Sequence, residues 1–461
     1  MSAVPTWSTS KKPLKFNNIH TVVMHVRPHL DELLAFFLAG CYGYDIFHGI
    51  IDAKIEFWGT GILLPGGKTA DELEKEGYLL IGIGGGRFDE HKEGGRNGKC
   101  AASLMAEFLG ISHYPEIKRL IEYAQQSDAF GDKDKFAFAS IIKTAQRNHK
   151  DPKEVVDWVY DILADYMDCM LGKNIAVQPG PDLNDIIFGY LDSEKIDLSS
   201  QGNPEDLIGT LLEISKVRPE YRLLAQYMGS LSSRSEDTFD LLTMVEWIRR
   251  TRPDEVVEEM EIYLNAYMAE QYDFHYHAET EIKNFGTWYN FDSKIGRIKA
   301  LVVQSDLQAV NAYARWRHRA GLIVQQNSTG NVQIYTNRKN RVDLRDIMAI
   351  LRVEEMSCKG GSLGETPDWD YIRQEGSIEE VPNWYFENRP GWILNGSLSH
   401  PGVEPTRINL ERLVRLIRLG LKPDPCREKG CPNGNCQLWQ YGLSFCRKRR
   451  WQIHNDQNNA D

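Results

Sequence analysis

Apolar residues in the first 130 positions follow two alternating patterns. Short runs rich in β-branched and aromatic residues predict strands, at residues 19–25, 53–59 and 78–84. Segments with apolar residues at helical spacing predict helices, at residues 31–43, 98–110 and 115–127. Strands that alternate with helices indicate a parallel sheet covered on both faces. In such sheets, binding sites form beyond the carboxyl ends of the strands.

The pattern changes twice further along the chain. Residues 136–285 are almost wholly helical in pattern, and strand-like and helix-like segments alternate again from about 296 to 420. We therefore expect a mixed α/β protein with four parts. They are a parallel-sheet metal-site domain at 1–135, a helical region at 136–290, a smaller α/β substrate-binding domain at 291–420, and a cysteine-bearing basic tail at 421–461.

Composition and charge indicate the general class of protein to which the chain belongs. Apolar residues make up 42% of the chain and charged residues 26%, as in globular proteins. No run of about 18 apolar residues suits a membrane span, and the first residues lack the apolar core of a secretory signal, so we expect a cytoplasmic protein without membrane contact. The net charge of −11 argues against non-specific coating of nucleic acid. Basic residues nevertheless cluster in the C-terminal third, at 315–319, 337–345 and 446–451.

The loop after the first predicted strand carries candidate metal ligands. His25, His29 and Asp31 form the pattern H-x3-H-x-D. Imidazole nitrogen and carboxylate oxygen are ordinary ligands of Mn, Zn and Fe. Glu32 begins the next helix, where the helix dipole favours a carboxylate. The alternative is that Asp31 only caps this helix and that both histidines are solvated.

Two more acidic segments follow the same predicted sheet. The stretch GIGGGRFDEH ends in Asp89, Glu90 and His91, after glycines that allow a close backbone approach to a ligand. Asp128 ends a predicted helix. Taken singly, these are a flexible charged turn and a routine loop acid. Together with the first loop they supply His, Asp and Glu ligands from three successive turns, as metal-dependent hydrolases require.

The order of these motifs resembles a known family. H-x3-H-x-D-E, then G-G-x-F-D-x-H, then a single Asp in a DAFG context is similar to the DHH-type phosphoesterase superfamily. The similarity is greatest to the branch described as metal-dependent hydrolases and RNA exonucleases. It covers roughly residues 19–135 and, more weakly, 380–420.

The resemblance implies a role for each matching residue. The expected metal ligands are His25, His29, Asp31, Asp89, Glu90 and Asp128. His91 takes the place of the histidine that contacts the scissile phosphate. Basic side chains near the motifs would meet the charge on the phosphoryl oxygens, and they are Arg27, Arg87 and Lys92. The implied cofactor is a divalent metal, Mn or Mg.

Two positions depart from the family pattern. Gly82 stands where the family usually has an aspartate that bridges two metals, and Glu90 replaces a histidine. These departures leave three interpretations of the function open: a one-metal enzyme, an enzyme with a changed chemistry, and a non-catalytic relative. If the missing carboxylate is the only defect, a Gly82→Asp change should restore some activity.

The second α/β domain offers a loop for substrate. The segment GWILNGSLSHPGVEPTR resembles in kind the Gly-rich, His-containing loop of the family. Its candidate substrate-binding residues are Asn395, Gly396, Ser397, His400 and Arg407. An ordinary turn is the alternative. Trp384, Tyr385 and Trp392 could stack on bases, and aromatic core packing explains them equally well.

Four cysteines near the C-terminus form a separate group. Cys426, Cys431, Cys436 and Cys446 give the spacing C-x4-C-x4-C-x9-C, with Gly and Pro between them. In a chain without a secretory signal this spacing favours one structural zinc over disulfides. A zinc knuckle would hold the basic RKRRW segment on the surface.

The sequence thus predicts a metal-dependent phosphoesterase or nuclease acting on nucleic acid or a nucleotide. The alternative is a catalytically impaired relative that only binds nucleic acid or a nucleotide. Hydrolysis of a small phosphate compound is a third hypothesis. The basic C-terminal third of the chain favours a polymeric substrate over a small one. The sequence leaves the oligomeric state open, with a homo-oligomer among the expectations.

Overall fold

The computed structural model describes residues 18–59, 64–90, 98–130, 134–148, 151–172, 179–196, 206–235, 238–340, 342–361, 368–388, 391–396 and 402–421. The chain divides into two compact units, Met1–Gln271 and Tyr272–Asp461. Both contain helices and strands, so the mixed α/β class expected from the sequence is confirmed. No helix in these ranges is long and apolar enough to cross a bilayer.

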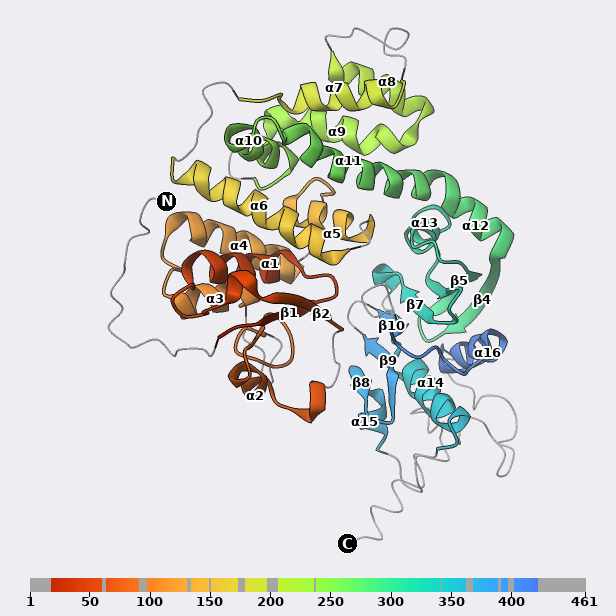
Figure 1. Cartoon of the computed structure of the whole chain (residues 1–461). Helices are drawn as coiled ribbons and strands as arrows, with labels where there is room; N and C mark the ends of the chain where they lie inside the picture. Colours follow the sequence, from red (N-terminus) through yellow and green to blue (C-terminus); the bar gives the residue numbers. More distant parts are fainter. Residues whose placement is uncertain are drawn as a thin grey trace, which may run out of the picture. The chain divides into compact units, whose positions relative to one another are not determined.

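The first unit is built on a three-stranded parallel sheet (Figure 1). Its strands, in the spatial order β2-β1-β3, are β2 (Lys54–Trp58), β1 (Thr21–His25) and β3 (Tyr78–Leu80). The parallel pairing agrees with the prediction from the alternating pattern. β3 ends earlier than expected because the backbone turns away at Gly82 and Gly84, which have φ angles of +66° and +77°.

Helices cover both faces of this sheet (Figure 1). One face packs into a large apolar core with the first helices of the unit. These are α1 (Leu30–Tyr42), α3 (Ala101–Leu109) and α4 (Pro115–Phe130). On the other face, Val23 and Leu80 pack against α2 (Ala70–Lys75) in a smaller cluster. β1 is buried on both sides, which explains its continuous apolar sequence.

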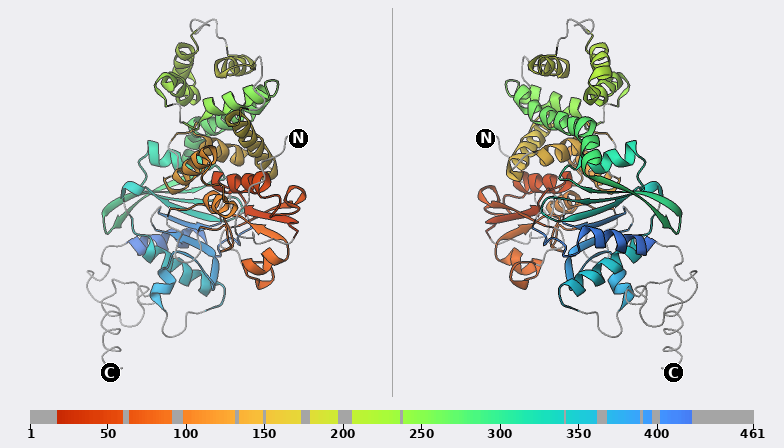
Figure 2. Two further views of the ribbon diagram at one scale, coloured as in Figure 1. Left: turned by 90° about the vertical axis from the view of Figure 1, so that its left-hand side faces the viewer. Right: turned by 90° about the vertical axis from the view of Figure 1, so that its right-hand side faces the viewer.

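The remainder of the first unit is helical, as its periodicity predicts. The helices are α5 (Phe138–Asn148), α6 (Pro152–Met170), α7 (Leu183–Ser193), α8 (Leu207–Val217), α9 (Arg222–Ser230), α10 (Leu241–Thr251) and α11 (Val256–Tyr272). Figures 1 and 2 show α7, α8 and α9 at the end of the unit farthest from the sheet. One core runs from Ile19 to Met268, so the predicted metal-site domain and helical region share it.

The second unit contains a seven-stranded sheet in the order β4-β5-β6-β7-β10-β9-β8. Only β5 and β6 pair in parallel; the other neighbours are antiparallel. The strands are β4 (Gly286–Ser293), β5 (Gly296–Gln304), β6 (Leu322–Gln326), β7 (Val332–Thr336), β8 (Gly376–Ile378), β9 (Val381–Glu387) and β10 (Trp392–Asn395).

Helices also pack on this second sheet. α14 (Arg345–Cys358) and α16 (Leu410–Leu421) contribute to its larger core, which includes Trp384. α12 (Ala278–Phe285) and α13 (Ala309–Arg317) contribute to a separate apolar cluster. The short helix α15 (Trp369–Arg373) packs against α14. A π-helical turn, Asp273–His277, precedes α12.

Candidate metal centre

The loop between β1 and α1 lies directly beyond the carboxyl end of the central strand. His25 is the last residue of β1, and α1 begins at Leu30 with Asp31 and Glu32 in its first turn. Acidic residues are favoured there because the first turn of a helix presents unpaired backbone N–H groups. The structure therefore places the HVRPHLDE motif where a parallel sheet forms its binding sites.

Glu32 organises this loop. Its Oε1 atom accepts a hydrogen bond from the backbone N–H of His25 at 3.1 Å and lies 2.9 Å from His25 Nδ1. Its Oε2 atom accepts from the backbone N–H of His29 at 2.8 Å. The side chain of Glu32 is only 4% exposed. One buried carboxylate thus fixes the backbone at both ends of the loop and orients the His25 ring.

Three predicted ligands converge beside this loop. His29, Asp31 and Asp128 each offer one ligand atom, and these atoms lie within 4.8 Å of one another. His29 Nδ1 is 4.0 Å from Asp128 Oδ1. Asp31 is buried, and its Oδ2 atom accepts from the backbone N–H of Ala101 at the start of α3, at 3.2 Å. Two carboxylates and one imidazole form a donor set that suits Mn, Zn or Fe.

The metal-free arrangement concentrates negative charge. Burial raises the pKa of Asp31 well above its ordinary range, and the charges of Glu32, Asp128 and Glu90 raise it further. Glu90 thus acts on Asp31 through its charge, but it is not in the group of ligand atoms that lie within 4.8 Å of one another. A divalent cation at this position would relieve the repulsion among the carboxylates, so the group has the electrostatics of a cation site.

The surroundings of His29 favour the protonation state that a metal ligand needs. Burial lowers its pKa most, and the positive charge of Lys143 lowers it as well, while Glu32 and Asp128 act in the opposite direction. The net direction is downward, which favours the neutral imidazole, the form that keeps a nitrogen lone pair for a cation.

Two further residues that the sequence predicts for the site, Asp89 and Arg87, lie in the glycine turn after β3. Asp89 Oδ2 accepts from the backbone N–H of Gly85 at 2.7 Å, so this carboxylate shapes the turn. Arg87 lies 3.6 Å from Glu74 Oε2 on α2, and its guanidinium carbon is 5.5 Å from the centroid of the Phe108 ring. Asp89 and Arg87 are thus engaged within the turn and its neighbours, while His29, Asp31 and Asp128 form the convergent group.

Gly82 is in contact with Glu32. A Cβ atom on Gly82 would lie 2.8 Å from Glu32 Cγ and 2.9 Å from Glu32 Oε1. Its φ angle of +66° is also one that side-chain-bearing residues rarely adopt. The Glu32 side chain occupies the space that a side chain at position 82 would need. The expectation that Gly82→Asp restores a bridging carboxylate therefore conflicts with the local geometry.

Helix α5 also belongs to this region, although no sequence motif points to it. Gln146, 7% exposed, donates a hydrogen bond from Nε2 to the backbone oxygen of Pro28 at 2.5 Å. This contact places α5 against the loop that carries the candidate ligands. The sequence shows only a glutamine within an amphipathic segment, and the partner of that glutamine lies 118 residues away.

The candidate substrate residues that the structure describes lie in the second unit. Asn395 has no exposed surface; its amide donates to the backbone oxygens of Asn383 and Glu404 and accepts from the N–H of Thr406. We infer a structural role for it in this loop. Gly396 follows with a φ angle of +76°, and Arg407 forms an ion pair with Glu404 at 3.2 Å.

The aromatic residues of this region have different environments. Trp384 is fully buried and donates to Glu355 Oε2 at 3.0 Å, so it is a core residue and not a stacking platform. Tyr385 and Trp392 are half-buried.

Several residues that the sequence predicts as site residues lie outside the described residues: His91, Lys92, Ser397, His400, Cys426, Cys431, Cys436 and Cys446.

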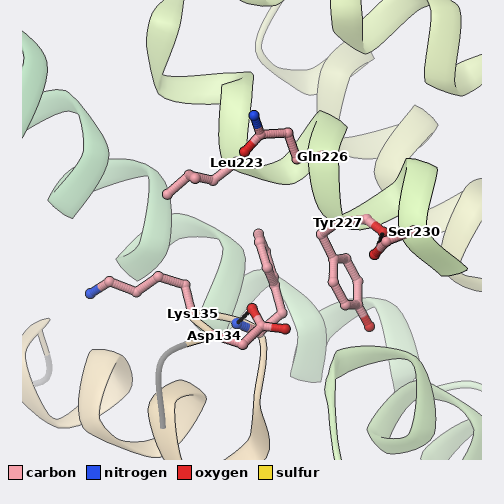
Figure 3. A pocket seen from close by; sticks show the side chains of 7 residues that line it. Asp134, Lys135, Leu223, Gln226, Tyr227 and Ser230 are labelled. Atoms are coloured by element: carbon pink, nitrogen blue, oxygen red, sulfur yellow. Dashed lines mark hydrogen bonds between the residues drawn. The ribbon is translucent and has the colours of Figure 1, made fainter. Parts of the chain in front are cut away.

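A separate hollow of about 250 Å³ lies between α9 and the segment before α5 (Figure 3). Its lining residues are Asp134, Lys135, Phe136, Leu223, Gln226, Tyr227 and Ser230. Asp134 accepts from the N–H of Phe136, and Lys135 forms an ion pair with Glu270 at 3.3 Å. Both charged groups of the hollow are therefore already paired, and it offers weaker chemistry than the loop of His29 and Asp31.

Comparisons with known proteins do not assign the chain to a family. No family model matches the chain, and no curated protein matches it. A crystal structure of an uncharacterized protein from Helicobacter pylori G27 is similar over 88% of this chain and 99% of that one, with 10% sequence identity and a TM-score of 0.20. A TM-score at this level supports no conclusion about fold or function.

Proposed function

We propose that this chain is a metal-dependent phosphoesterase that hydrolyses phosphodiester bonds in nucleic acid or nucleotides. The observation that carries the proposal is the convergence of His29, Asp31 and Asp128 beyond the carboxyl end of a parallel strand. The order of these motifs, which resembles that of DHH-type phosphoesterases, supports the choice of reaction. The cofactor we propose is Mn or Mg, because oxygen-rich ligand sets with few imidazoles suit these ions.

The chain's own residues supply the conditions for such a reaction. Asp31 and Asp128 would balance the charge of the cation, and His29 would present a neutral nitrogen to it. Glu32 holds the backbone of the loop so that these ligands keep their spacing. A bound divalent cation supplies Lewis acidity toward phosphoryl oxygens and makes water easier to deprotonate.

One observation favours a second candidate, a relative that binds nucleic acid or a nucleotide without cleaving it. Gly82 leaves no acid at the place where the resembled family carries its bridging aspartate, and Glu32 fills the space. The remaining group of three residues suits one cation better than two. A single cation can bind a phosphate without activating water and leaving group together.

Hydrolysis and binding can be separated by one experiment. The full-length protein is incubated with labelled single-stranded and double-stranded oligonucleotides and a small phosphodiester, with Mn, Mg, Zn or Co. We expect cleavage with at least one ion and a loss of about 100-fold or more in the Asp128→Ala variant, since a metal ligand is lost. Oligonucleotide binding without turnover under every condition would reject the enzyme and leave the binding module.

A further inference from the structure

Helices α12 and α13 of the second unit carry a group of aromatic rings. α13 packs beside α12 and the π-helical turn Asp273–His277 (Figure 1). The ring centroid of Phe274, on this turn, lies 5.3 Å from that of Tyr313 and 5.5 Å from that of Trp316, and the last two are 5.8 Å apart. Tyr313 is 8% exposed, whereas Trp316 is 62% exposed. The group thus extends from the apolar cluster of these helices to an indole ring at the surface.

Neighbouring rings fix the orientation of the Trp316 side chain. Because Phe274 and Tyr313 support it, the exposed part of the indole is a pre-ordered flat surface. Phe274 reaches it from a π-helical turn, a rare geometry that is frequent at functional sites. A single exposed aromatic residue needs no ligand to explain it. The charges around Trp316 therefore decide what this ring can do.

The ring contacts continue from Trp316 and Tyr313 to a lysine. The ring centroid of His318 lies 5.9 Å from that of Tyr313 and 5.2 Å from that of Trp288. Lys299 Nζ lies 4.2 Å from the centroid of the Trp288 ring and donates to the backbone oxygen of His318 at 3.2 Å. An aromatic ring attracts a cation placed over its face, so Lys299 is held in this position.

Arginines add positive charge beside the same group. The chain at 315–319 reads RWRHR. Arg317 and Arg319 flank His318, are exposed, and form no ion pair with an acid of the described residues. Glu279, the acid that pairs with His318 at 2.7 Å, thus does not neutralise them. Both arginines present a charge that an anionic ligand can meet.

The backbone at Arg319 supports a role for its side chain. Its φ angle is +54°, in the left-handed region. The N–H of Ala320 donates to the backbone oxygen of Ala314 at 3.1 Å, which closes the end of α13 in a motif that usually has glycine at the position of Arg319. The helix dipole favours a cation near this end but does not require a left-handed residue with a side chain. A strained residue at the surface indicates that its side chain is used.

We propose that Trp316, Arg317, Arg319 and Lys299 form a surface that binds single-stranded nucleic acid. An unpaired base stacks on the exposed indole, and the cations meet the phosphates of the neighbouring nucleotides. This combination of an aromatic ring and positive charge is typical of single-strand binding, and a duplex has no free base faces to offer. The inference rests on the proposed function in that the nucleic acid would be its substrate or ligand, and it narrows that class to single strands.

Fluorescence anisotropy with labelled oligonucleotides of about 12 nucleotides tests the surface, since such sites cover roughly 4–16 nucleotides. Full-length protein is titrated into single-stranded RNA, single-stranded DNA, the matching duplex and an abasic strand, without divalent cation. We expect Trp316→Ala to weaken single-strand binding about tenfold, the loss typical of one stacked base, and Trp316→Phe to lose less. The abasic strand should bind wild type and Trp316→Ala equally. Equal single-strand affinity of wild type and Trp316→Ala would overturn the proposal.

Arg319→Gly separates binding from folding. Glycine adopts the left-handed conformation without strain, so this variant should unfold at a temperature at least as high as that of wild type. It should nevertheless bind the single strand about threefold more weakly. Combined with Arg317→Ala, it should lower the slope of log affinity against log salt by about 1, because each phosphate contact on a single strand contributes about 0.7. An unchanged affinity and slope would overturn the role of the arginines.

Two exposed residues elsewhere provide matched controls. Tyr44 in the first unit is 55% exposed, and Arg415 on α16 is 69% exposed and pairs with Glu411. Tyr44→Ala and Arg415→Ala should leave single-strand affinity unchanged, and losses equal to that of Trp316→Ala would overturn the proposal. A wild-type dimer that Trp316→Ala dissociates in analytical ultracentrifugation, without binding of oligonucleotides, would show that a second copy covers the ring. Binding to anionic lipid vesicles alone would likewise contradict the surface.

These measurements distinguish the surface from the proposed enzyme. Single-strand binding that depends on Trp316, in a protein that cleaves no substrate with any ion, would support the surface and reject the metal-dependent enzyme. Cleavage of a small phosphodiester that Asp128→Ala abolishes, with single-strand affinity independent of Trp316, Arg317 and Arg319, would overturn the surface alone.

Discussion

At the scale of single residues, Glu32 connects the loop after β1 with the neighbouring glycine turn. Its carboxylate bonds the backbone at His25 and His29, and its side chain lies against Gly82 on the neighbouring turn. The sequence predicted only that an acid is favourable at the start of α1. The contact with Gly82 joins positions 50 residues apart, and no local pattern encodes it. It explains why position 82 has no side chain.

Gly82 offers a direct test of this contact. Gly82→Ala should lower the free energy of unfolding by more than about 2 kcal/mol, because a left-handed backbone costs a side-chain-bearing residue roughly 1–2 kcal/mol and the new Cβ would also overlap Glu32. Gly85→Ala is the control: its φ is +68°, and a Cβ there would meet nothing within 4 Å. Urea denaturation of both variants measures the difference. Equal losses would show that Glu32 does not restrict position 82.

Asp31 should destabilise the metal-free protein at neutral pH. An acid whose pKa is higher in the folded than in the unfolded state makes folding less favourable as pH rises above the unfolded value, since the folded protein holds its proton more tightly. Without metal, Asp31→Asn should be more stable than wild type by roughly 1–3 kcal/mol at pH 7. This advantage should vanish below about pH 4, where Asp31 is protonated in both states. Thermal unfolding across this pH range measures the effect; a less stable variant at pH 7 would contradict it.

At the scale of elements, periodicity predicted the first sheet and its helices well. β1, β2 and the helices of residues 98–130 agree with the predicted segments to within a few residues. The short strands of residues 376–395 were not predicted, because their aromatic, proline and glycine residues also fit loops. The position of α5 could not be predicted, since packing against Pro28 depends on tertiary structure and not on the helix's own sequence.

The contact of α5 with the loop should matter for metal binding. Gln146→Ala removes the donor to the Pro28 carbonyl and should cost about 1–2 kcal/mol of stability and weaken Mn²⁺ binding, because the loop loses a support. Asn148→Ala is the control, since Asn148 donates within α5 to Thr144 and more distantly to Ala266. Calorimetric titration with Mn²⁺ compares the two variants. Unchanged Mn²⁺ affinity in Gln146→Ala would show that α5 does not support the ligands.

At the scale of the whole molecule, the candidate centre belongs to the first unit. His29, Asp31 and Asp128 all lie within Met1–Gln271, on elements that share one apolar core. The residues of the candidate centre could be proposed from sequence because each follows a strand or ends a helix, where local patterns are informative. The contribution of α5 could not, because only the fold brings Gln146 to the backbone of Pro28.

The central claim is that His29, Asp31 and Asp128 bind a divalent cation, and Mn²⁺ titration followed by electron paramagnetic resonance tests it most directly. Mn²⁺ prefers oxygen and nitrogen ligands, so a four-cysteine site elsewhere in the chain would not compete for it. We predict saturable binding of Mn²⁺ to the wild-type protein and at least tenfold weaker binding to Asp31→Asn and Asp128→Asn. Equal Mn²⁺ binding by the wild type and both variants, or no binding by the wild type, would contradict the account.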